Sequence, residues 1–336
     1  MNSKPVGVAL AGAGAWGMNL ARNFAGLPAS RLLWICDPDP KGRAKAAKLG
    51  YVKAAESLAA ALEDPEVEAV VVSASAAAHH ALARAALLAG RDVFVEKPMA
   101  LTVADAEDLV GLAESGRRIL MAGHLLLYHP AVVKLRSLID SGELGRVHYL
   151  YSQRVNLGTI RRDENALWSF APHDISVMNH LLGGEPEDVS ARGQAYVQPG
   201  IVDVVFLNMR YAEGRMAQIQ ISWLDPHKIR KFTIVGSKKM AVFDDMESSE
   251  KVRIYDRGVE GGGIVSYNES LTLRFGDILI PNIEMAEPLR LECEHFLECV
   301  RARSRPVTDG TKGLEVVRVL AAAQQSLDRN GEPVRL

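Results

Sequence analysis

The sequence predicts an α/β protein with a doubly wound parallel sheet, followed by an α/β domain with a large, mainly antiparallel sheet. Three observations carry this prediction: apolar runs alternate with helical segments over the first 125 residues, a period-two polarity follows, and a glycine-rich turn comes directly after the first apolar run. The chain has 336 residues, which is enough for two domains with cores of their own.

Strands and helices alternate in the first part of the chain. Short runs too apolar to be half exposed are predicted as buried strands, at 6–12, 31–37, 69–75, 92–98 and 118–124. Between them, a 3.6-residue apolar period predicts helices at 18–27, 41–49, 57–64, 80–90 and 104–115. This alternation is typical of a parallel sheet with helices on both faces.

The pattern changes after a predicted helix over 129–145. Alternating polarity predicts strands at 148–158, 188–198, 203–214, 215–225, 230–245 and 251–258. Such an antiparallel sheet has one open face, either solvated or covered by a partner. Two amphipathic helices follow, over 287–303 and 313–331. We expect a boundary near residue 125, which gives a cofactor domain over 1–125 and a substrate and oligomerisation domain over 126–336.

Composition and charge exclude several classes of function. The net charge is −2, so nothing indicates a nucleic-acid or anionic-membrane partner. No stretch approaches the length of a membrane span, and the start, MNSKPVGVALAGAG, lacks the features of a signal peptide. The three cysteines, Cys36, Cys293 and Cys299, form no CxxC pair, and their spacing is poor for a zinc site. We therefore expect buried thiols without a metal, in a cytoplasmic protein.

The glycine-rich turn GAGAWG follows the first predicted strand and precedes a helix. Gly12 and Gly14 permit a tight turn and a close backbone approach to a pyrophosphate, and Gly17 lets the helix pack on the sheet. With Ala15 and Trp16, these glycines are expected to bind a dinucleotide at the helix N-terminus.

Asp37 ends the second predicted strand, where an acidic residue hydrogen-bonds the ribose hydroxyls and repels a 2′-phosphate. Its alternative role is to begin the DPDP turn. With the glycines in place we favour the ribose role, and NAD over NADP as cofactor.

Glu96, Lys97 and Pro98 follow a buried strand, and ligands of parallel sheets bind at the carboxyl ends of strands. Pro98 keeps Lys97 extended. The Lys97 ammonium could then hydrogen-bond a substrate hydroxyl and stabilise the negative charge that develops as hydride leaves. The alternative is a solvated lysine at a turn, and its place at the end of a strand of the cofactor sheet favours function.

Several of these segments resemble the Gfo/Idh/MocA oxidoreductases. The resemblance rests on GAGAWG, on SAAAH from Ser75 to His79, on the spacing of AGRDVFVEKPMA, and on the helical and antiparallel second half, and it covers essentially the whole chain. It implies a Rossmann domain joined to an α/β domain whose open sheet often forms a subunit interface, so we expect a homodimer or homotetramer. It also implies oxidation or reduction of hydroxyls on sugars, inositols or nucleotide sugars with NAD(P).

The resemblance also assigns residues to the site. Lys97 matches the catalytic lysine of the family, and His173 matches the histidine of its D-x-x-x-H motif and would accept the proton. His79, Ser75 and Glu96 are expected to line the cofactor cleft, with His80 exposed on a helix. For His124 and Tyr128, a pocket role and a core role are about equal.

The second half is similar to the subgroup of the family that acts on nucleotide-activated amino sugars. This similarity implies oxidation at C3 of a sugar such as UDP-N-acetylglucosamine. The polar stretch before His173 is expected to contact this substrate, although it could instead be a surface loop whose charges pair with one another. The expected substrate residues are Arg154, Asn156, Arg161, Asp163 and Asn165.

One position departs from the family pattern. Ser169 stands where the motif usually has an aspartate, four residues before His173. This departure motivates one alternative to the nucleotide-sugar enzyme, an NAD-binding sensor without catalysis. A separate alternative within the enzyme class is an inositol or free-sugar dehydrogenase. Pro172 is expected in the first turn of a helix, which would explain Asp174 as a carboxylate near the positive helix end and would keep His173 neutral.

Overall fold

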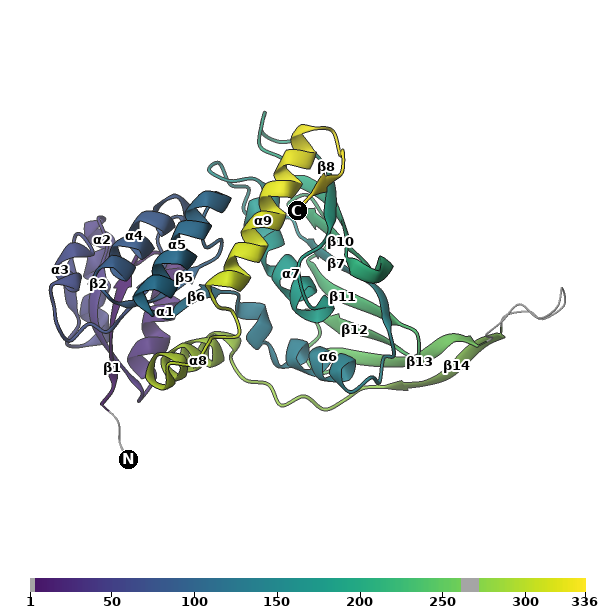
Figure 1. Cartoon of the computed structure of the whole chain (residues 1–336), viewed down its shortest axis with the longest axis horizontal. Helices are drawn as coiled ribbons and strands as arrows, with labels where there is room; N and C mark the ends of the chain where they lie inside the picture. Colours follow the sequence, from purple (N-terminus) through teal and green to yellow (C-terminus); the bar gives the residue numbers. More distant parts are fainter. Residues whose placement is uncertain (1–3, 261–271) are drawn as a thin grey trace. The chain divides into compact units, whose positions relative to one another are not determined.

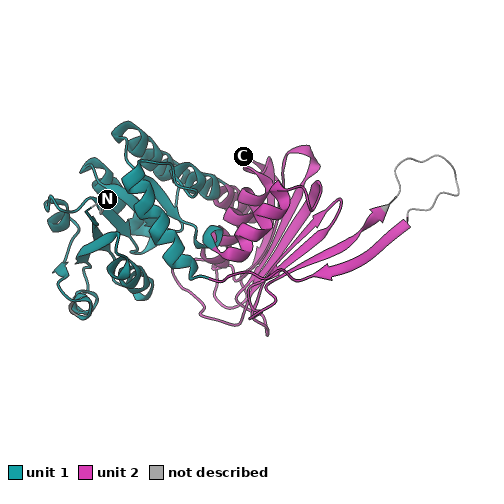
Figure 2. Cartoon of the chain, turned by 90° about the horizontal axis from the view of Figure 1, so that it is seen from below, with its two compact units in different colours: residues 1–128, 286–318 teal, residues 129–285, 319–336 magenta. Residues whose placement is uncertain are grey.

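The computed structural model describes residues 4–260 and 272–336 (Figure 1). Residues 1–3, part of the segment considered above as a signal peptide, lie outside the described residues. The chain forms two compact units: unit 1 is 1–128 with 286–318, and unit 2 is 129–285 with 319–336 (Figure 2). No described helix is both long and apolar enough to cross a membrane.

Unit 1 contains a six-stranded parallel sheet in the order β3-β2-β1-β4-β5-β6. The strands are β1 Val6–Ala11, β2 Ser30–Cys36, β3 Lys53–Ala55, β4 Ala69–Val72, β5 Asp92–Glu96 and β6 Leu120–Gly123. The predicted parallel sheet is confirmed, and every residue of β1, β4, β5 and β6 is buried. β3 was not predicted, because this short edge strand is partly exposed and carries no apolar run.

Helices follow most strands of unit 1. They are α1 Ala15–Gly26, α2 Pro40–Ala44, η1 Ala46–Leu49, α3 Ala59–Leu62, α4 Ala76–Leu88, α5 Val103–Gly116, η2 Leu125–Tyr128 and α8 Pro288–Ala302. α9, Gly310–Asp328, begins in unit 1 and ends in unit 2. All three cysteines of the chain are buried free thiols, as expected.

Helix α8 belongs to unit 1, although the sequence placed it in the second domain. The Phe296 ring packs edge-on against Phe94 of β5, with centroids 5.8 Å apart, and against Phe24 of α1, at 6.3 Å. This aromatic contact joins residues distant in the chain, so no local pattern could show it. The compact units therefore differ from the expected division into 1–125 and 126–336.

Unit 2 contains a nine-stranded sheet in the order β14-β13-β12-β11-β7-β10-β9-β8-β15. The strands are β7 Val147–Val155, β8 Asp188–Gln194, β9 Val204–Arg210, β10 Met216–Ser222, β11 Ile229–Gly236, β12 Met240–Asp244, β13 Val252–Glu260, β14 Thr272–Leu279 and β15 Val334–Arg335. β7 and β10 pair in parallel, and the other described neighbours are antiparallel, so the predicted sheet is confirmed.

One face of this sheet carries helices. α6 (Pro130–Asp140), α7 (Ala166–Leu182) and the end of α9 lie on the same side of the sheet in Figure 2. The strands alternate accordingly: along β9, Val205, Leu207 and Met209 are buried, whereas Phe206 between them is 46% exposed. Among the described residues no α-helix lies on the opposite face.

Helix α7 begins earlier than the sequence suggested. It starts at Ala166, where the Asn165 side chain accepts a hydrogen bond from the Trp168 N–H at 3.1 Å. Pro172 therefore lies inside the helix rather than in its first turn, so the prediction for this proline was wrong. Prolines favour first turns only on average, and here an asparagine cap earlier in the chain starts the helix.

Candidate active site

The candidate residues belong to both units, and those of each unit are built on the elements of that unit. In unit 1, the glycine-rich loop joins β1 to α1. Gly12 has a φ of 102°, and a Cβ there would lie 2.5 Å from the backbone oxygen of Ser73. A Cβ at Gly17 would lie 2.0 Å from the Gly12 oxygen, so glycine lets α1 begin this close to the loop. A Cβ at Gly14 would meet no atom within 4 Å. This open space at the helix N-terminus fits the pyrophosphate of a dinucleotide.

Asp37 follows β2 and holds the glycine-rich loop. Its carboxylate accepts hydrogen bonds from the Ala13 N–H at 2.6 Å and from the Asp39 N–H at 2.8 Å. The second bond forms the turn that was the alternative explanation, so Asp37 has a structural role in addition to its predicted one. A Cβ at Gly42 would lie 2.6 Å from the carboxyl carbon of Asp37, so this glycine keeps the next helix close. Contact with the ribose stays a prediction.

Glu96 and Lys97 lie at the carboxyl end of β5. The Glu96 side chain is buried and accepts hydrogen bonds from the indole N–H of Trp16 and from the backbone N–H of Lys97, the latter at 3.2 Å. Trp16 belongs to the first turn of α1, so this bond ties the end of β5 to the glycine-rich loop. Burial holds the pKa of Glu96 above its ordinary value, against the opposing effects of Trp16 and Lys97.

His124 follows β6, and the positive charge of Lys97 acts on its imidazole. It is 1% exposed, and neither ring nitrogen has a hydrogen-bond partner among the described residues. Burial, and then the positive charge of Lys97, lower the pKa of His124 to about 4, so the imidazole is neutral near pH 7. Tyr128 instead faces the core: its hydroxyl lies 3.2 Å from Thr308 Oγ1, and its ring packs on His295. This geometry favours the core role for Tyr128.

His79 joins the ends of two strands. It is 2% exposed, with Nδ1 2.8 Å from the Pro98 oxygen and Nε2 3.1 Å from the Ala74 oxygen. His80 was expected to be exposed, but it is half-buried and its Nε2 lies 2.8 Å from Asp108 of α5. The two helices α4 and α5 pack together, and this contact explains the burial. Ser75 is exposed at the N-terminus of α4.

In unit 2, His173 lies in the middle of α7 and is half-buried. Ser169 lies one helical turn earlier on the same face and is 3% exposed. Because the helix begins at Ala166, its positive end is not beside His173, and the predicted effect of that end on the imidazole is wrong. The role of His173 as a proton acceptor stays a prediction.

Asp174 also has a different explanation from the predicted one. It is fully buried in α7 and pairs with Arg154 of β7, whose Nε donates to its carboxylate. The prediction that a helix N-terminus accounts for Asp174 is therefore wrong. Arg154, which was expected to contact substrate, is 8% exposed, and its guanidinium neutralises this carboxylate.

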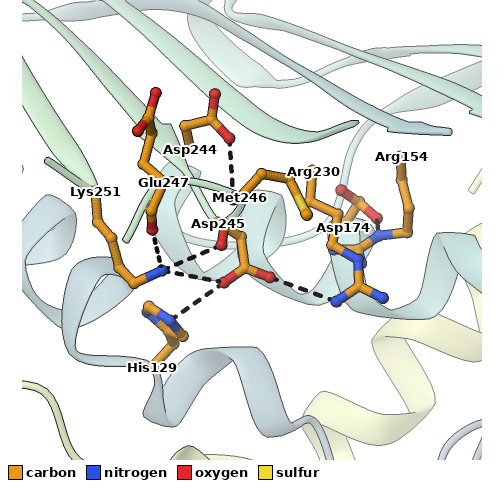
Figure 3. A network of polar contacts seen from close by, with 9 residues as sticks. All are labelled: His129, Arg154, Asp174, Arg230, Asp244, Asp245, Met246, Glu247 and Lys251. Atoms are coloured by element: carbon orange, nitrogen blue, oxygen red, sulfur yellow. Dashed lines mark hydrogen bonds and ion pairs between the residues drawn. The ribbon is translucent and has the colours of Figure 1, made fainter. Parts of the chain in front are cut away.

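A second arginine lies directly opposite Arg154. Arg230 of β11 is its partner in the strand register, and it pairs with Asp245 at 3.5 Å. Asp245 also lies 3.6 Å from His129 Nε2 and 3.9 Å from Lys251 Nζ, as Figure 3 shows. Acidic side chains thus compensate two arginines that would otherwise repel each other across the strands.

The other expected substrate residues lie before α7. Arg161 pairs with Glu164 at 3.0 Å, which is the kind of local charge pair that the surface-loop alternative predicted. Asn165 caps α7, a local role that the sequence did not predict. Asp163 is exposed, and Asn156 is half-buried after β7. Within residues 4–260 and 272–336, no three His, Cys, Asp or Glu side chains gather as metal ligands would.

Sequence reasoning missed Glu292 of α8. This glutamate is fully buried, and neither carboxylate oxygen has a hydrogen-bond partner among the described residues. A signal was present: Glu292 lies on the apolar face of an amphipathic helix, between Leu289 and Phe296. A charged residue at a core position of a helix is uncommon and indicates a special environment.

A glycine-rich loop after the first strand of a parallel sheet, with a lysine at the end of β5, defines a dinucleotide-dependent oxidoreductase. The chain belongs to the Gfo/Idh/MocA family. Residues 6–124 match the model of the oxidoreductase family with an NAD-binding Rossmann fold, and residues 132–242 match the GFO/IDH/MocA C-terminal domain. The matched Rossmann domain is an NAD-binding domain, so the cofactor is NAD.

Two similar relatives act on different substrates, an inositol and a nucleotide sugar. The chain is 26% identical to the scyllo-inositol 2-dehydrogenase (NAD(+)) of Bacillus subtilis, over 98% of this chain and 95% of that protein. It is 28% identical to the UDP-N-acetylglucosamine 3-dehydrogenase of Acidithiobacillus ferrooxidans, over 94% of each. A solved structure of the latter has a TM-score of 0.82, at 25% identity, and covers 98% of this chain and 99% of that one.

A third similarity concerns the fold alone. GenD2 from gentamicin A biosynthesis, solved in complex with NAD, has a TM-score of 0.84 at 22% identity, and covers 100% of this chain and 97% of its own.

Proposed function

We propose that the chain is an NAD-dependent dehydrogenase that oxidises a sugar hydroxyl to a ketone, at C3 of a nucleotide amino sugar such as UDP-N-acetylglucosamine. The observation that carries the proposal is the placement of Lys97 at the carboxyl end of β5, next to Glu96 and within the electrostatic reach of His124. The substrate is supported by the UDP-N-acetylglucosamine 3-dehydrogenase that aligns over 94% of this chain.

Lys97 and His173 have different roles in the proposed reaction. The Lys97 ammonium hydrogen-bonds the reacting hydroxyl and stabilises the negative charge that grows on its oxygen. His173 accepts the hydroxyl proton, which leaves the carbonyl oxygen of the ketone. Bound NAD supplies the acceptor for the hydride from the same carbon. Because His124 is neutral, it places no second positive charge beside Lys97.

The open loop at Gly14 is the place for the pyrophosphate, and Asp37 is the expected ribose contact. We assign Ala15, Trp16, Ser75, His79 and Glu96 to the surroundings of the cofactor. In unit 2, Arg154, Asn156, Arg161, Asp163 and Asn165 are the proposed substrate contacts, of which Asp163 is exposed and Asn156 is half-buried.

The test is turnover of purified protein with NAD and UDP-N-acetylglucosamine, followed by NADH absorbance. Lys97→Met should lower kcat by about a thousandfold, because the charge on the oxygen is no longer stabilised. His173→Ala should lower kcat by roughly a hundredfold or more, with little change in NAD affinity. His227→Ala, at an exposed position, is the matched control. Equal losses of NAD binding and turnover in the His173 variant would contradict its role as a base.

An inositol is the second candidate substrate. The NAD-dependent scyllo-inositol 2-dehydrogenase of Bacillus subtilis aligns over 98% of this chain, which favours this alternative. A panel of scyllo-inositol, myo-inositol, N-acetylglucosamine and UDP-N-acetylglucosamine separates the two. The nucleotide-sugar proposal requires kcat/KM for the UDP-sugar to exceed the others by at least about a hundredfold.

We also propose that the open face of the unit 2 sheet forms the interface of a homodimer or homotetramer. Tyr149, Tyr151, Phe206 and Met216 are all at least 38% exposed on β7, β9 and β10. Tyr149 lies beside Met216 in the strand register and stacks with Tyr151, at 6.5 Å between ring centroids. An apolar patch of this kind on a soluble protein marks an interaction surface.

A further inference from the structure

Two glutamates lie on facing surfaces of unit 1. Residues two apart on a strand share one side, so Glu96 lies on the same side of β5 as Phe94. Residues four apart on a helix share one face, so Glu292 lies on the same face of α8 as Phe296. The rings of Phe94 and Phe296 are in contact, 5.8 Å between centroids. The packing of α8 on β5 therefore turns Glu292 toward Glu96.

Neither glutamate has a basic side chain as a hydrogen-bond partner among the described contacts. Glu96 accepts from Trp16 and from the backbone of Lys97, and Glu292 has no partner for either oxygen. The other groups that act on the pair electrostatically come from the elements around it: Lys97, Tyr128 and Cys293. An ionised carboxylate buried without a partner costs several kcal/mol, and a buried glutamate keeps its proton instead.

We propose that Glu96 and Glu292 form a buried carboxyl pair that holds one proton, with Glu292 as a positioning residue that keeps Glu96 ionised for the cofactor loop. The neutral Glu292 carboxyl directs its O–H toward Glu96 and stabilises the single negative charge there. Ionised Glu96 is the stronger acceptor for the Trp16 indole, because hydrogen bonds to charged acceptors are stronger than neutral ones. Burial and the charge of Glu96 both raise the pKa of Glu292, in agreement with this assignment.

The pair therefore couples NAD binding to pH. As the pH falls and Glu96 takes up a proton, its bond to Trp16 weakens and the loop that binds NAD is held less firmly. We expect NAD affinity to fall by roughly tenfold from the ionised to the protonated state of Glu96. This inference concerns NAD binding alone and does not depend on the identity of the sugar.

The test is the dissociation constant of NAD for the full-length protein, measured by calorimetry over a series of pH values. Glu292→Gln keeps an N–H donor in place of the carboxyl O–H, so the pH at which affinity is half lost should stay within a few tenths of a unit of wild type. Glu292→Met removes the donor, so this pH should rise by about one unit. Glu298→Gln, an exposed glutamate of the same helix, is the matched control.

Each alternative has its own result. If Glu292 were ionised, Glu292→Gln would remove a repelling charge, and the inflection would move to lower pH, which overturns the proposal. An unchanged inflection in Glu292→Met would show that Glu292 does not act on Glu96. Trp16→Phe avoids any change to the core, because Trp16 is 42% exposed. Without the indole donor, NAD should bind more weakly at high pH and its affinity should change little with pH, and a wild-type pH profile would break the proposed link between the pair and the loop.

Discussion

His79 and His124 are both buried near strand ends in unit 1, but their surroundings differ. His79 has a carbonyl oxygen at each ring nitrogen and so joins the ends of β4 and β5. His124 has no hydrogen-bond partner among the described residues and lies within reach of Lys97. The sequence could name both residues as candidates. It could not separate them, because these surroundings come from other strands.

The stability of the protein should depend on pH through His124. Its pKa is lowered from 6.5 to about 4, so between these values the unfolded chain binds more protons than the folded one. The contribution of neutral His124 to the free energy of unfolding is fully present above pH 6.5 and is lost as the pH falls toward 4. The loss at pH 5 is about 2 kcal/mol. Urea unfolding measures the free energy of unfolding at each pH. Between neutral pH and pH 5, this free energy should fall by about 2 kcal/mol less in His124→Gln than in wild type.

The control for this experiment is His227→Gln, because His227 is exposed. Its stability should follow the wild-type pH profile. A His124→Gln protein with the full wild-type loss in acid would contradict the neutral, buried state of His124.

At the scale of elements, β7 and α7 are joined by the buried pair of Arg154 and Asp174. The two residues come from different elements, so local patterns could not show that they meet. The sequence instead explained each one alone, Arg154 by substrate and Asp174 by a helix end. For Asp174 this explanation was wrong, and Pro172 led to it, since a proline in the first turn would have placed Asp174 near the helix N-terminus. The substrate contact of Arg154 stays a proposal.

Breaking this pair should destabilise the protein strongly. Asp174→Ala leaves the Arg154 guanidinium buried without its carboxylate and should lower the free energy of unfolding by about 3–5 kcal/mol. The double variant Asp174→Leu with Arg154→Met removes both charges and should recover most of that loss. Urea unfolding measures both values. A loss below about 1 kcal/mol in Asp174→Ala would show that the pair is not buried in solution.

At the scale of the whole molecule, the two sheets were predictable to different degrees. The buried apolar runs predicted β1, β2, β4, β5 and β6, because strands covered on both faces leave a strong signal. β14 was missed because its residues are mostly exposed and give no alternation of burial, and β15 is too short to show one. The placement of α8 in unit 1 depends on its contact with Phe94 and Phe24, which only the folded chain reveals.

The oligomeric state should depend on the open sheet face. Tyr151→Glu places a charge on this apolar surface and should shift the protein to monomers in light scattering. Tyr51→Glu makes the same substitution at a fully exposed position of unit 1, outside this face, and should keep the wild-type assembly state as the matched control. Wild type that is monomeric at micromolar concentration would contradict the proposed interface.

The fate of one hydrogen atom tests the central claim most directly. UDP-N-acetylglucosamine deuterated at C3 should transfer its label to the cofactor, and mass spectrometry should find the reduced cofactor heavier by one deuterium. The sugar product should be a 3-keto sugar without the label. Oxidation of scyllo-inositol at a higher kcat/KM, or no label in the cofactor while turnover proceeds, would contradict the proposal.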